Sequence, residues 1–79
     1  MHEDRSRVLV LGATGYVGGR LVPELIQSGF DVRCMTRTPQ GLSGTAWARD
    51  VEVVDGDLSD LSSIGPAFDG VDQVVYLVH

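Results

Sequence analysis

Three glycines at intervals of three residues stand between an apolar run, Val8 to Leu11, and an amphipathic segment. Gly12 would permit a tight turn, Gly15 would let the backbone approach a pyrophosphate, and Gly18 would let a helix pack closely. The N–H groups and partial positive charge at the start of that helix would attract phosphate oxygens. The loop therefore predicts a dinucleotide site. Its candidate contacts are Gly12, Thr14, Gly15, Tyr16, Val17 and Gly18.

Two alternatives compete with a dinucleotide site at this loop. Glycines also occur in tight strand-to-helix turns that bind nothing, but the position of this loop between a strand and a helix favours a ligand site. A Walker-type NTPase loop is disfavoured because Gly19 and Arg20, and not a Lys-Ser/Thr pair, follow the last glycine.

The second candidate for chemistry is Arg37. NAD-selective domains usually carry an acidic residue near the end of the second strand, where it bonds the ribose 2′-hydroxyl. This chain has Thr36-Arg37 there. A guanidinium would attract a 2′-phosphate and can stack on adenine, which favours NADP(H) over NAD(H). The alternative is a solvated surface arginine, because the pattern fixes the strand end only to within a few residues.

The spacing of apolar residues predicts the helices and strands that must position these residues. Helical spacing predicts a helix from Tyr16 to Ser28 that Gly29 ends, and Pro23 inside it can cause a kink. Ser59 is expected to cap a second helix. A loop is expected over 38–45, and Leu42, Ala46, Trp47 and Ala48 can add one short helix. The predicted strands are 8–11, 31–36, 51–54 and 74–78, of which the first and last have the pattern of strands buried on both faces.

Strands that alternate with helices predict an α/β fold with a doubly wound parallel sheet of strand order 3-2-1-4. The carboxyl ends of strands one and four would flank the ligand site. Strand four would be a hydrophobic edge that invites pairing with other chains through residues 74–78. We therefore expect residues 1–79 to be the N-terminal part of a longer nucleotide-binding domain, with an obligate oligomer as the alternative.

The composition of the chain argues against several classes of binding partner. The formal net charge of -5, with 6 basic and 11 acidic residues, offers no basic stripe for nucleic acid. No apolar run approaches the ~20 residues of a membrane span, and the charged start lacks a secretory signal, so the cytosol is expected. Cys34 is interpreted as a buried structural thiol. The sequence has no second cysteine and no suitably spaced histidine pair, so no metal site is predicted.

The stretch VLVLGATGYVGG, from Val8 to Gly19, resembles the opening of the extended and atypical short-chain dehydrogenase/reductases. Further similar landmarks are Met35-Thr36-Arg37, Trp47, residues 51–54, 56–60 and 71–79. The resemblance implies a Rossmann-like NAD(P)-binding domain. It also implies that Asp57 binds the adenine amino group, with Asp55 and Asp60 as nearby alternatives, and that Leu58 adds backbone and apolar contact. The resemblance places Leu77, Val78 and His79 along the ribose and nicotinamide side.

The catalytic Tyr-x-x-x-Lys pair of that family does not occur in these residues. The sequence has no lysine, and its two tyrosines, Tyr16 and Tyr76, fall in cofactor-binding elements. No catalytic residue is therefore predicted. Two functions remain open: the binding module of an NADP(H)-dependent oxidoreductase or epimerase, or a non-catalytic nucleotide sensor and interaction module. A truncated product that folds poorly and aggregates is the third alternative.

Overall fold

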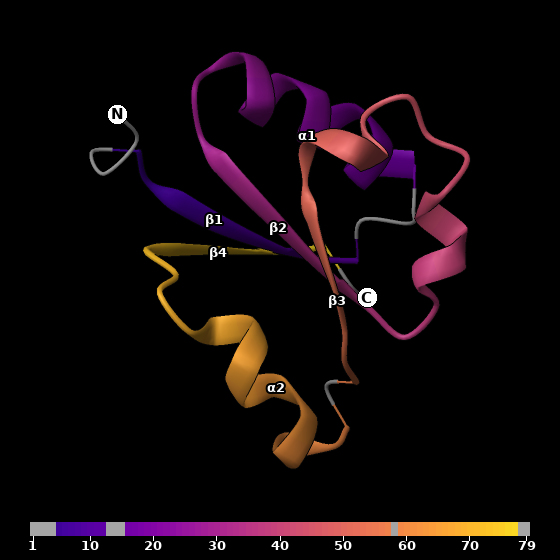
Figure 1. The fold of residues 1–79 in the computed structure, drawn as a ribbon, viewed down its shortest axis with the longest axis vertical. Coiled ribbons are helices and arrows are strands. Elements are labelled where there is room, and N and C mark those ends of the chain that lie inside the picture. The colour runs from indigo at the N-terminus through magenta and orange to yellow at the C-terminus, as the bar shows by residue number, and fades with distance from the viewer. Residues whose placement is uncertain (1–4, 13–15, 58, 78–79) are drawn as a thin grey trace.

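The computed structural model describes residues 5–12, 16–57 and 59–77 (Figure 1). Four strands and two α-helices alternate along the chain, with two short 3₁₀ helices before β3. The elements are β1 (Arg7–Leu11), α1 (Tyr16–Gln27), β2 (Asp31–Thr36), η1 (Pro39–Leu42), η2 (Ala48–Asp50), β3 (Glu52–Asp55), α2 (Leu61–Phe68) and β4 (Gln73–Tyr76).

The four strands form one parallel sheet in the order β3-β2-β1-β4, as predicted. Leu11 of β1 is in register with Met35 of β2 on one side and with Tyr76 of β4 on the other. Figure 1 shows α1 on one face of the sheet and α2 on the opposite face. This is the doubly wound arrangement that right-handed β-α-β crossovers give when the chain reverses direction across the sheet.

The core divides into two layers because successive residues of β1 point to opposite faces. Val8 and Val10 pack on the α1 side, and Leu9 and Leu11 pack on the α2 side. All four are buried, which confirms that the first strand is covered on both faces. The remaining buried members of the α1 layer are Val22, Val32, Cys34, Leu42 and Trp47, and those of the α2 layer are Met35 and Ala67.

Helix α1 contains Pro23 and ends at Gln27, one residue before the predicted end. The predicted stop at Gly29 is confirmed. Gly29 has φ 93, its N–H donates to the carbonyl of Ile26 at 3.1 Å, and the N–H of Phe30 donates to the carbonyl of Leu25 at 3.1 Å. A left-handed residue of this kind ends a helix, and glycine adopts it without a steric penalty.

The segment between β2 and β3 differs from the prediction. One short helix was expected, but two 3₁₀ helices form, and η1 lies inside the predicted loop. Leu42 of η1 and Trp47 before η2 are buried against the α1 face, so burial of these two side chains shapes the segment. β3 begins at Glu52 and ends at Asp55, one residue later than predicted.

The predicted cap of the second helix is also wrong. Asp60, and not Ser59, is the N-cap of α2, and its Oδ1 accepts the backbone N–H of Ser62 at 3.1 Å. Both residue types are good caps, so the sequence pattern alone did not separate them. Ser59 instead donates its hydroxyl to Asp57 at 2.8 Å.

The prediction that the fourth strand is buried on both faces is wrong as well. Val74 and Tyr76 are 44% and 62% exposed, and Val75 alone is half-buried within β4. β4 lies at the edge of the sheet, and α2 packs under β1 and β2 on that face, so no described element covers Val74 or Tyr76. Residue 78, the predicted end of this strand, lies outside the described residues.

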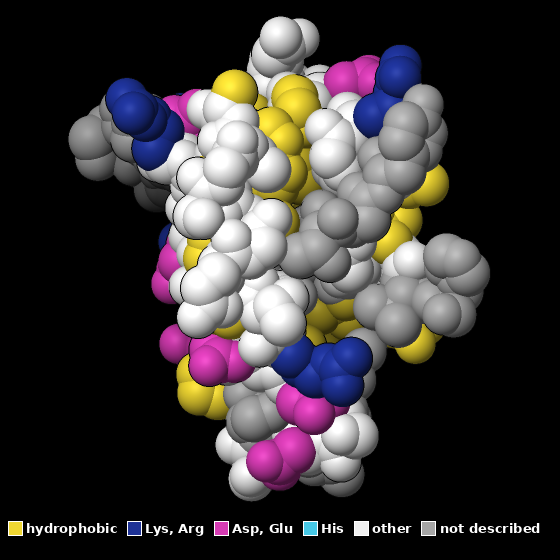
Figure 2. Space-filling model, turned by 90° about the vertical axis from the view of Figure 1, so that its right-hand side faces the viewer, with side chains coloured by type: hydrophobic (Ala, Val, Ile, Leu, Met, Phe, Trp, Pro, Cys, Tyr) yellow, Lys and Arg dark blue, Asp and Glu magenta, His cyan; other side chains and the backbone are white. Residues whose placement is uncertain are grey.

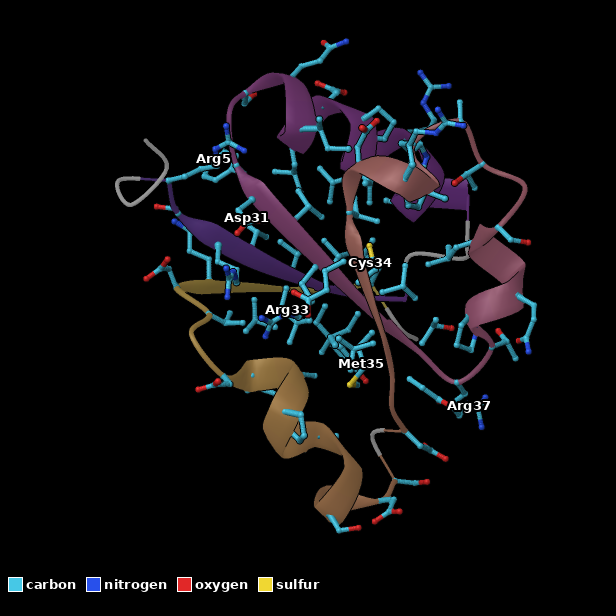
Figure 3. All side chains as sticks on the ribbon, in the orientation of Figure 1. Arg5, Asp31, Arg33, Cys34, Met35 and Arg37 are labelled. Carbon is cyan, nitrogen blue, oxygen red and sulfur yellow. The ribbon has the colours of Figure 1, made fainter. Side chains whose placement is uncertain are left out.

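Helix α2 is attached to the sheet by a buried arginine that the sequence did not single out. Arg33 of β2 is 6% exposed and forms an ion pair with Glu52 at 2.9 Å (Figure 3). Its Nη1 donates to three backbone carbonyls at the end of α2, those of Pro66, Ala67 and Asp69, at 3.3, 2.8 and 2.8 Å. A helix end leaves its last carbonyls without partners inside the helix, and Arg33 supplies a donor to them, although the Pro66 carbonyl also accepts the N–H of Asp69 at 3.4 Å.

Candidate functional site

The carboxyl ends of β1 and β4 lie side by side, because the two strands are neighbours in a parallel sheet. The N–H of Leu77 donates to the carbonyl of Leu11 at 2.8 Å and so continues this pairing beyond β4. Leu77 is half-buried and packs against the α1 layer. In open α/β sheets ligands bind in the crevice where the strand order reverses, which is here between β1 and β4.

The glycine loop leaves β1 at this point. Gly12 has φ 93, a backbone conformation that glycine adopts readily and most other residues avoid. Gly18, in the first turn of α1, is buried, whereas Val17 is 57% exposed. A turn at Gly12 followed by a buried glycine in the first turn of α1 is the geometry expected of a phosphate-binding loop. Thr14 and Gly15 lie outside the described residues, as does the side chain of Tyr16.

Arg37 follows β2 directly and is exposed at the same edge of the sheet (Figure 3). The N–H of Thr38 donates to Oγ1 of Thr36 at 3.0 Å, so a short hydrogen-bonded turn surrounds Arg37. This edge faces the viewer in Figure 2, where basic and acidic side chains lie next to each other in its lower half. The position of Arg37 therefore allows contact with a ligand at the carboxyl edge.

Asp57 follows β3 and lies across from Arg37. Its Oδ1 accepts the backbone N–H of Ser59 at 2.9 Å and the Ser59 hydroxyl at 2.8 Å. The two Ser59 hydrogen bonds lower the pKa of Asp57 below its ordinary value, desolvation opposes them, and the charge of Arg37 adds to the lowering. Asp57 is therefore an oriented, ionised carboxylate, a group that can accept further hydrogen bonds.

The structure brings Gly12, Arg37, Asp57 and Leu77 to one edge of the sheet, because each follows the carboxyl end of a different strand. Leu58, Val78 and His79 lie outside the described residues. Of the two alternatives to Asp57, Asp55 ends β3 itself and Asp60 caps α2. Sequence reasoning missed Ser59 as a partner of Asp57, although the Asp-x-Ser spacing is a known signal for such a turn.

The arrangement suits a dinucleotide in three separate respects. A helix start attracts a pyrophosphate, an exposed guanidinium attracts a further phosphate, and an ionised carboxylate accepts an amino hydrogen. Among residues 5–12, 16–57 and 59–77 no group of three or more His, Cys, Asp or Glu side chains could hold a metal ion. Within the same residues no helix is long and apolar enough to cross a membrane.

The sequence profile of the NmrA-like family matches residues 4–79 of this chain. The chain belongs to the NmrA-like family. The match confirms the expected kinship with Rossmann-type reductases and epimerases, which the glycine loop and the landmarks of the later strands had indicated.

Curated relatives of this NmrA-like chain include enzymes and other proteins. A 3 beta-hydroxysteroid dehydrogenase/Delta 5-->4-isomerase from Mycobacterium tuberculosis is 37% identical over 71 residues, which are 90% of the chain and 18% of the relative. A photosystem II assembly factor Ycf39 from Cyanophora paradoxa is 33% identical over 70 residues, which are 86% of the chain and 21% of the relative. The chain thus spans about a fifth of the length of these relatives.

A solved Rossmann-fold NAD(P)-binding family protein from Shigella flexneri superposes with a TM-score of 0.81 at 20% identity. The superposition covers 92% of the NmrA-like chain and 37% of that protein. It confirms the Rossmann fold and the parallel sheet of order 3-2-1-4.

Proposed function

We propose that this NmrA-like chain is an NAD(P)-binding module and that it prefers NADP(H) to NAD(H). The observation that supports the proposal best is the left-handed conformation of Gly12 at the end of the buried strand β1, together with the burial of Gly18 in the first turn of α1. The pyrophosphate would lie against the loop 12–18 and the N-terminus of α1. Thr14, Gly15, Tyr16 and Val17 would supply its other contacts, and Gly18 would keep the helix close.

The preference for NADP(H) rests on Arg37. Its guanidinium is exposed at the carboxyl edge, where a 2′-phosphate would extend from the adenosine ribose. Asp57 would accept the adenine amino group, with Leu58 beside the ring, and Leu77, Val78 and His79 would line the ribose and nicotinamide side. No acidic residue occupies the position where an NAD-selective domain binds the 2′-hydroxyl.

Calorimetric titration of the 79-residue chain with NADPH and NADH tests nucleotide binding. Gly15→Asp puts a side chain and a negative charge in the path of the pyrophosphate, so we expect it to abolish binding of both nucleotides. Gly44→Asp is the matched control, because it makes the same change where a Cβ meets no atom within 4 Å. The proposal fails if the folded wild-type chain binds neither nucleotide, or if both variants bind as the wild type does.

The nucleotide preference is tested by Arg37→Ser. Loss of a charge-assisted bond to phosphate is expected to weaken NADPH binding about 10- to 100-fold and to leave NADH binding nearly unchanged. Arg5→Ser removes an equal charge from an exposed arginine at the far side of the molecule (Figure 3) and should leave both affinities unchanged. Equal losses for the two nucleotides would argue against a 2′-phosphate contact.

The activity of the whole protein is a further proposal. We propose an oxidoreductase or epimerase whose catalytic residues are not among these 79 residues, in keeping with the dehydrogenase among the relatives. The alternative is a non-catalytic nucleotide sensor, which the assembly factor among the relatives favours. A Tyr-x-x-x-Lys spacing and NADPH-dependent turnover in the whole protein would separate the two. A cytosolic location also stays a prediction, which cell fractionation would test.

A further inference from the structure

Asp57 and Ser59 form one of two successive side-chain turns before α2. Oδ1 of Asp57 accepts the backbone N–H and the hydroxyl of Ser59 at 2.9 and 2.8 Å. Three residues later, Oδ1 of Asp60 accepts the same two groups of Ser62 at 3.1 and 2.6 Å. The local chemistry is the same in both turns, but Asp60 caps the helix, whereas Asp57 lies two residues after the end of β3, at the carboxyl edge of the sheet.

From this difference we infer that Ser59 is a positioning residue for the nucleotide site: it holds the Asp57 carboxylate in the orientation that accepts the adenine amino group. The inference rests on the proposed function. Two donors on a single oxygen restrict the rotamer of the Asp57 side chain. An aspartate without such bonds would sample several rotamers. Ser59 therefore acts through Asp57 and needs no contact of its own with the nucleotide.

The same two donors also favour the ionised form of Asp57. Hydrogen bonds to a carboxylate stabilise its charged form, and those from Ser59 are the largest causes of the lowered pKa of Asp57. The charge of Arg37, which follows β2, also lowers the pKa of Asp57, and its effect is smaller. The ionised carboxylate offers two acceptor oxygens to the adenine amino group, whereas a protonated carboxyl group would turn one of them into a donor, so the ionised form is the better partner.

The test compares Ser59→Ala with Ser62→Ala in the 79-residue chain, and uses NADP⁺ as the probe. Each variant deletes one hydroxyl that bonds an aspartate, so the chemical change is identical. Ser59→Ala is expected to weaken NADP⁺ binding about 3- to 10-fold, and Ser62→Ala is expected to leave the affinity unchanged. Circular dichroism would establish that both variants keep the wild-type fold.

A second readout needs no ligand. Carbon-detected NMR titration of the aspartate carboxyl groups is expected to show a higher pKa of Asp57 in Ser59→Ala than in the wild type, because one of its donors is gone. Ser62→Ala should leave this pKa unchanged. A purely structural role of Ser59 would not produce this site-specific change, since unfolding would move every aspartate.

Different results would contradict the positioning role of Ser59 and the proposed nucleotide binding. Wild-type affinity in Ser59→Ala, or an unchanged pKa of Asp57, would overturn the role of Ser59 while nucleotide binding by the wild type stands. If Asp57→Ala binds NADP⁺ as the wild type does, Asp57 makes no adenine contact and the role of Ser59 falls with it. If the wild-type chain binds neither NADP⁺ nor NAD⁺, the proposed function itself fails.

Discussion

At the residue scale, Cys34 in β2 shows how burial changes the pKa of a side chain. The side chain is fully buried in the α1 layer, and desolvation raises the pKa of its thiol from 9.0 to about 11. No neighbouring base or helix start among the described residues activates it, which fits a structural thiol. The raised pKa connects protonation of this thiol to the stability of the fold.

We expect the free energy of unfolding to fall by about 2 kcal/mol as pH rises from 9 to 11. In this window the unfolded chain has lost the thiol proton and the folded chain has kept it, so rising pH favours unfolding. Urea unfolding followed by fluorescence of Trp47, the single tryptophan, measures the effect. Cys34→Ala is the control. If it shows the same loss between these pH values, other groups are responsible.

At the scale of elements, Arg33 decides how α2 is attached to the sheet. The side chain of its partner Glu52 is 56% exposed, so water screens the ion pair and its net contribution is small. Of the three carbonyls at the end of α2, that of Ala67 lies in a buried residue, and a buried acceptor that loses its donor costs more. The carbonyl bonds are therefore expected to outweigh the ion pair.

Two substitutions separate these contributions. Arg33→Met removes the ion pair and the carbonyl bonds and is expected to lower the free energy of unfolding by about 1–3 kcal/mol. Glu52→Gln removes only the opposite charge and is expected to cost less than about 1 kcal/mol. Chemical denaturation monitored through Trp47 gives both values. A larger loss for Glu52→Gln than for Arg33→Met would reverse the interpretation.

At the scale of the whole molecule, β4 leaves an apolar edge open. Val74 and Tyr76 alternate along the strand, lie on the same face and are largely exposed. Exposed hydrophobic edge strands pair with strands of other chains. We therefore predict that the 79-residue chain self-associates through residues 74–78.

Sedimentation velocity over a range of concentrations tests this prediction. The wild-type chain should show a mass that grows with concentration, and Val74→Lys should remain monomeric because the charge disfavours strand pairing. Val17→Lys is the matched control, since Val17 is also exposed, at 57%, but lies on α1. A wild-type chain that stays monomeric throughout would show that β4 does not associate.

The sequence by itself determined those features that depend on local chemistry and simple periodicity. The apolar run of β1 predicted a buried strand, and Gly12 and Gly29 predicted a turn and a helix end, and the structure has all three. The strand order followed as well, because the handedness of β-α-β units leaves few ways to arrange alternating strands and helices.

The tertiary structure decided what depends on neighbours distant in sequence. Whether β4 is covered, whether Ser59 or Asp60 caps α2, and where Arg33 finds its partners all depend on which groups the fold brings together. A run of valines looks the same at an edge as in the centre of a sheet, and Ser and Asp have similar capping strength. Burial and partner choice are properties of the packed chain, so only the packed chain determined them.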